Sequence, residues 1–132
     1  MNHLPLVLLL VIPILGYRWA NKKKPAAKLT VLGASWGLIA SPFSMGLYSA
    51  YFIPYVGLIP GMVGLVSAML HGTPGYEISV ALGLIESHTV VENAGSIICY
   101  FIDAVFWAIV YGFLGFLADR FRLSKRQAGA KV

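Results

Sequence analysis

Three ionisable side chains cluster in residues 83–95, which read GLIESHTVVENAG, within a chain that is otherwise strongly apolar. His88 and Glu92 are four residues apart, so on one helix their side chains are neighbours. Glu86 then points almost to the opposite face from His88. An imidazole and a carboxylate at this spacing could share a metal ion, pass a proton or bind a neighbouring subunit.

The metal and haem alternatives are weak because ligands are too few. A zinc site needs three or four ligands, and no HExxH pattern or second histidine pair is present to complete one. His71 is the remaining internal histidine, and it falls in a predicted turn on the other side of the membrane from His88, which disfavours a haem held by both. We predict no cofactor and keep haem or a metal as the minor alternative.

Asp103 is the clearest candidate for an ionisable group inside a membrane. It lies seven residues into the predicted span 96–118, with Ser96 and Cys99 on the same helical face. An aspartate at a helix centre costs about 2.5 to 3.5 kcal/mol on insertion scales, so such residues usually face inward and are often functional. The predicted intramembrane polar site comprises Glu86, His88, Asp103 and Glu92.

The competing interpretation is structural. Glu92 and His88 are then hydrated residues at an outer turn, and Asp103 is protonated and bonded to a tyrosine or a backbone group. The sequence offers little support for catalysis, since it contains no nucleophile motif, no glycine-rich phosphate loop and no paired carboxylates at a defined spacing.

Composition identifies the kind of protein that must hold these groups. Of 132 residues, 58% are hydrophobic and only 11% are charged, which is far from the soluble range. We therefore expect a single integral membrane domain, an all-α polytopic bundle, with lipid and other membrane subunits or further copies of itself as partners and no nucleic acid.

The basic residues set the expected topology, because no lysine or arginine occurs between Leu29 and Asp119. Basic residues flanking spans stay in the cytoplasm and meet anionic headgroups there. This predicts a protein of a bacterial inner membrane with its amino terminus outside and its carboxy terminus in the cytoplasm. The residues assigned to topology or headgroup contact are Lys22, Lys23, Lys24, Arg120, Arg122, Lys125 and Arg126.

With both basic clusters inside, the number of crossings between them must be even. The favoured arrangement has about five spans, at 2–18, 29–48, 53–70, 76–91 and 96–118, with an inner turn at 71–77 and a basic tail at 119–132. The alternative has three spans, with 53–91 on or partly within the outer leaflet as a re-entrant segment.

Small residues predict how the helices pack. Gly33, Gly37, Ala40 and Ser44 share one helical face, and Gly57, Gly61, Gly64 and Ala68 repeat the same spacing. In lipid, such faces allow close backbone approach. We expect an antiparallel hairpin that pairs these residues in reverse order: Gly33 with Ala68, Gly37 with Gly64, Ala40 with Gly61, and Ser44 with Gly57.

These features favour a small subunit or accessory protein of a larger inner-membrane complex, without catalytic activity of its own. The first alternative is a self-assembling transporter, channel or holin-like pore with an acidic relay. The second is an electron-transfer subunit that binds haem or quinone.

Overall fold

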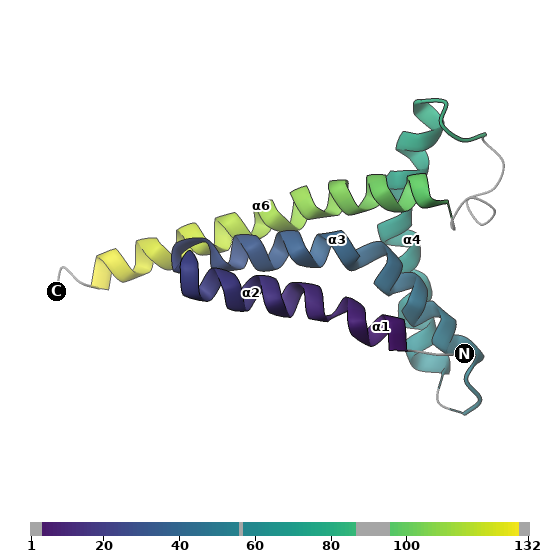
Figure 1. Cartoon of the computed structure of the whole chain (residues 1–132), viewed down its shortest axis with the longest axis horizontal. Helices are drawn as coiled ribbons and strands as arrows, with labels where there is room; N and C mark the ends of the chain where they lie inside the picture. Colours follow the sequence, from purple (N-terminus) through teal and green to yellow (C-terminus); the bar gives the residue numbers. More distant parts are fainter. Residues whose placement is uncertain (1–3, 56, 87–95, 130–132) are drawn as a thin grey trace.

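The computed structural model describes residues 4–55, 57–86 and 96–129, and every regular element in them is helical. The expected all-α class is confirmed. Figure 1 shows α2, α3 and α6 side by side along the long axis, with α4 crossing one end of them. The elements are α1 (Leu4–Leu9), α2 (Val11–Lys23), η1 (Pro25–Ala27), α3 (Lys28–Tyr48), η2 (Ser49–Phe52), α4 (Leu58–Ala81) and α6 (Ile97–Gly129).

The amino-terminal segment forms two helices because of one proline. Pro13 has no N–H with which to bond the carbonyl four residues back, on Leu9, and α1 ends at that residue. The chain resumes as α2 after Leu10 and continues through Lys23, beyond the predicted end of the first span at residue 18. Helix α2 then packs against α3.

Helices α3 and α6 pack closely against each other. A Cβ added at Gly33 would lie 2.0 Å from the carbonyl oxygen of Tyr111, and one added at Gly37 would lie 2.2 Å from that of Trp107. On the other helix, Gly115 faces the backbone of Leu29. Because the facing positions run in opposite directions, the pair is antiparallel, and its backbones approach as small residues allow.

The predicted hairpin register is wrong. Gly64 packs against the backbone of Tyr48 and Gly61 against Tyr51, so they meet the carboxyl end of α3 and η2. Gly33 and Gly37 are occupied by α6 instead. The sequence pattern identified faces suited to close approach but not their partners, since α6 carries glycines of its own that complement those of α3. Gly57 is buried against Ala50 and Ile53, Ser44 lies against His71, and Ala40 is buried.

The predicted inner turn at 71–77 is also wrong. Helix α4 continues through Pro74 and Gly75 to Ala81, so the segments 53–70 and 76–91 are not two separate spans. Five spans are not supported. Two helical stretches of the described residues are long and apolar enough to cross a membrane by length and composition, Pro25–Phe52 and Ile97–Lys125.

The two basic segments lie at the same end of the molecule. Asp119 of α6 accepts hydrogen bonds from the backbone N–H groups of Leu29 and Thr30, each at 2.9 Å, and from the Thr30 hydroxyl at 3.0 Å. Arg122 donates to the carbonyl oxygen of Pro25 at 2.7 Å. These contacts join the start of α3 to the late part of α6, and α4 crosses at the other end (Figure 1).

Candidate functional site at the crossing of α3, α4 and α6

Asp103 is buried where the three helices meet. It is 1% exposed, and its Oδ1 accepts a hydrogen bond of 2.6 Å from the backbone N–H of Gly75. Its Oδ2 accepts one of 3.3 Å from the hydroxyl of Ser41. A Cβ on Gly75 would lie 2.6 Å from this carboxyl group and 2.4 Å from the carbonyl oxygen of Cys99. The carboxyl group therefore reaches the backbone of α4 only because residue 75 is glycine.

His71 lies one turn before Gly75 on α4 and is also buried. Its Nδ1 is 2.8 Å from the carbonyl oxygen of Ser67 and 3.1 Å from the hydroxyl oxygen of Ser44. Its Nε2 is 2.7 Å from the hydroxyl of Tyr111. A carbonyl only accepts, so we assign the proton to Nδ1 and let Tyr111 donate to Nε2.

The neutral form of His71 fits its surroundings. Helix α4 is outside the two candidate spans, and burial there lowers the pKa of His71, against the smaller opposing effect of the Ser67 carbonyl. The ring also packs edge-on against Trp107, with centroids 4.8 Å apart. The imidazole is consequently held in one orientation by groups from all three helices.

Two side chains of α6, Asp103 and Trp107, form hydrogen bonds with the backbone of α4. In a regular helix the N–H of Gly75 bonds the carbonyl of His71, four residues earlier. Here that N–H donates to Asp103, and that carbonyl accepts from the indole N–H of Trp107 at 2.9 Å. Pro74, beside them, has no N–H to donate. These two bonds tie α4 to α6 beside Pro74.

Further polar contacts lie next to these bonds, on α4 and on α3, and each joins residues four apart on one helix. Beyond Gly75, the hydroxyl of Ser79 donates to the Gly75 carbonyl at 2.5 Å and lies 3.7 Å from the sulfur of Cys99. On the other side, the Ser44 hydroxyl donates to the carbonyl of Ala40 at 2.7 Å. Small polar groups thus line the crossing from Cys99 to Tyr111.

The structure describes two of the four predicted site residues, Asp103 and Glu86. Asp103 is at the crossing as described. Glu86 follows α4 and is exposed. His88 and Glu92 lie outside the described residues, so the proposed four-residue patch stays a prediction.

Sequence reasoning missed His71, Ser41 and Tyr111 as neighbours of this site. The turn predicted at 71–77 puts His71 on the far side of the membrane, whereas His71 lies one helical turn from Gly75, which donates to Asp103. A signal was present: His71, Gly75 and Ser79 recur every four residues, as do Cys99, Asp103, Trp107 and Tyr111. Two such stripes favour helices that pack along them.

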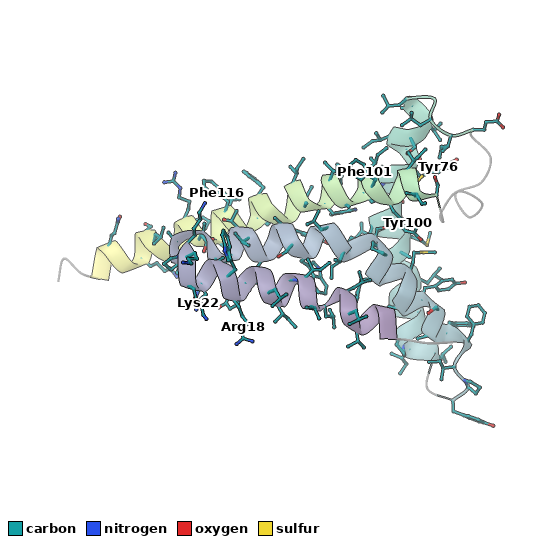
Figure 2. The ribbon with its side chains drawn as sticks, viewed as in Figure 1. Arg18, Lys22, Tyr76, Tyr100, Phe101 and Phe116 are labelled. Carbon is teal, nitrogen blue, oxygen red and sulfur yellow. The ribbon has the colours of Figure 1, made fainter. Side chains whose placement is uncertain are left out.

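The basic end contains a second buried aspartate, Asp119, which is 2% exposed. Its Oδ1 lies 3.5 Å from a guanidinium nitrogen of Arg122. Figure 2 shows Arg18 and Lys22 projecting at this end of the bundle, opposite Tyr76 and Tyr100 at the α4 crossing. The two ends thus differ in charge.

The described residues contain no group of three or more His, Cys, Asp and Glu side chains that could hold a metal ion. Both ring nitrogens of His71 already have partners. A haem iron at His71 would have to displace the bond to Tyr111.

Comparison of the chain with protein-family models, curated proteins and solved structures gave no match.

Proposed function

We propose that the chain is a small integral membrane protein that crosses the bilayer with α3, α6 and the amino-terminal helices, while α4 lies within the opposite leaflet. Dimensions support this arrangement. Residues 29–41 of α3 rise about 20 Å, and a helix lying across their end adds about 10 Å. The sum matches a hydrocarbon core of about 30 Å. This is the three-span alternative, with the basic end in the cytoplasm of a bacterial cell.

Within that arrangement, we propose that the protein is an accessory subunit that packs against a partner in the membrane. The observation that carries this proposal is the apolar face of α4 that the fold leaves uncovered. Seven of its apolar side chains are more than half exposed, although the helix is anchored by the polar crossing on its other face. They are Leu58, Ile59, Met62, Val63, Val66, Met69 and Leu70.

The polar crossing supports a structural role more than transport. Each oxygen of Asp103 has a partner within the chain, and so has each ring nitrogen of His71. Buried polar groups that are satisfied in this way fix the position of helices and need no ion or substrate to complete them. The role of the crossing is then to set the angle at which α4 presents its apolar face.

Photo-crosslinking in cells tests the accessory-subunit proposal. A photoreactive amino acid at Val66, which is 67% exposed on α4, should capture one unlike membrane chain in a defined product. The matched control is Leu15, which is 58% exposed on α2. Capture of lipid alone or of a second copy at Val66 would contradict the proposal, as would the same product from both positions.

Proton transport is the second candidate, and one observation favours it. Three pairs of hydrogen-bonding side chains follow one another along the crossing: Cys99 with Ser79, Asp103 with Ser41, and His71 with Tyr111. Proteoliposomes under a pH gradient test it. Asp103→Asn keeps an acceptor for Gly75 but cannot release a proton at neutral pH. A proton flux in the wild type that this variant abolishes would replace the structural interpretation of the crossing.

A further inference from the structure

Two apolar grooves open beside Trp36, one on each side of α3. The first has a volume of about 350 Å³ and lies between α2 and α3, where Leu10, Ile14 and Tyr17 face Leu32 and Trp36. The second has a volume of about 480 Å³ and lies between α3 and α6. Leu32 and Trp36 line both, so the grooves are neighbours. Each volume is within the range of ligand sites in proteins.

Positive charge is placed at one end of the first groove. Arg18 lines the groove at the end that leads to the basic segment, and Figure 2 shows its side chain extending outward from α2. The ammonium group of Lys28 lies 5.6 Å from the centre of the Tyr17 ring, which also lines the groove. The opposite end, at Leu10 and Trp36, is apolar. A ligand with an anionic head and an apolar tail matches this gradient.

The charge at this end is not balanced by acids of the described chain. Asp119 is the acid that the fold brings here, and it is already bonded to the start of α3 and paired with Arg122. Arg18 and Lys28 make no ion pair within the described residues. An external anion therefore has two cations available to it.

From these features we propose a binding site for one anionic diacyl phospholipid of the cytoplasmic leaflet. Its phosphate lies between Arg18 and Lys28, one acyl chain follows the groove between α2 and α3, and the other follows the groove between α3 and α6 across Trp36. The grooves run along α3, so a bound lipid stands parallel to its bilayer neighbours. The proposal rests on membrane insertion of α2, α3 and α6 and is independent of the partner proposed for α4.

Native mass spectrometry of the detergent-solubilised full chain tests the site. The probes are dioleoyl phosphatidylglycerol and dioleoyl phosphatidylcholine at equal concentration, which share acyl chains and differ in charge. We expect the wild type to retain one phosphatidylglycerol in preference to phosphatidylcholine. Each cation near a surface contributes about 1 kcal/mol, so Arg18→Gln and Lys28→Gln should each lower the preference about fivefold.

Two further variants separate a built site from general attraction. The double variant Lys23→Gln/Lys125→Gln removes the same charge as Arg18→Gln/Lys28→Gln but touches neither groove, and it should retain the preference. Ile14→Trp narrows the first groove and should reduce binding of both lipids. Ile14 is 55% exposed, and circular dichroism checks that the fold is unchanged.

Three results would overturn the proposal. They are equal retention of the two lipids by the wild type, the same loss in both double variants, and undiminished binding by Ile14→Trp.

Discussion

The two buried aspartates of α6 perform related tasks in different surroundings. Each carboxylate accepts backbone N–H bonds from another helix: Asp119 from the first residues of α3, and Asp103 from the interior of α4 at Gly75. At the start of α3 the N–H groups have no helical partner, so Asp119 serves the purpose of a capping residue supplied from a distant part of the chain. Asp103 instead serves a helix interior.

Charge compensation differs between the two sites. Asp119 accepts from N–H groups at the positive end of the α3 dipole and pairs with the guanidinium group of Arg122. The bonds found for Asp103 come from Gly75 and Ser41, and both groups are neutral. Asp119 thus acts through its charge, and Asp103 acts through its hydrogen bonds. Substitutions can separate these two roles.

The largest effect is expected at Gly75, on which access to Asp103 depends. Gly75→Ala puts a methyl group against backbone and carboxyl atoms that cannot both move, so it should destabilise the fold by about 3 kcal/mol. Gly72→Ala, on the same helix, meets no atom within 4 Å and should stabilise by up to about 1 kcal/mol. Unfolding in mixed micelles, followed by circular dichroism, measures both. Similar values would mean that the crossing is loosely packed.

Alanine at each aspartate comes next in size. Asp103→Ala leaves the N–H of Gly75 without its acceptor in a site that water does not reach, at a cost of about 2 to 3 kcal/mol. Asp119→Ala should cost about 1 to 2 kcal/mol, as for the loss of a helix cap, because Leu29 and Thr30 are only partly buried and water can reach their N–H groups once the carboxylate is removed. The same unfolding assay ranks the two. A larger loss for Asp119→Ala would contradict the expectation that water can reach the N–H groups at the start of α3.

Asparagine should reverse that ranking. Asp103→Asn keeps an oxygen for Gly75 and an amide that can bond Ser41, so we expect a change below about 1 kcal/mol. Asp119→Asn retains the cap but loses the charge that faces Arg122 and the helix dipole, at about 1 kcal/mol. If Asp103→Asn proves the more costly of the pair, Asp103 acts through its charge, and the proton-pathway candidate gains.

The sequence predicted well what depends on local composition. An all-helical chain followed from its apolar content, and Asp103 was identified as an inward-facing acid because ionised groups are costly in such surroundings. The glycines at 33 and 37 were identified as sites of close approach. Each of these inferences needs only residue type and helical spacing.

The sequence could not predict what depends on partners far along the chain. The run HGTPGYE contains residues typical of a turn, yet α4 passes through it, and Asp103 and Trp107 of α6 bond its backbone there. The two bonds come from residues that are 28 and 36 positions away along the chain. Similarly, the glycine face of α3 has two possible partners, and only the three-dimensional packing selects α6.

Ionic strength should distinguish the two aspartates by the smallest effect. Arg122 is 26% exposed, so the contribution of its pairing with Asp119 is open to screening by salt. The cost of Asp119→Asn should therefore fall by a few tenths of a kcal/mol between low and high salt. The cost of Asp103→Asn should stay constant, since that residue is sealed and its partners are neutral. A salt-dependent cost at Asp103 would reveal a charged neighbour and contradict the division of roles.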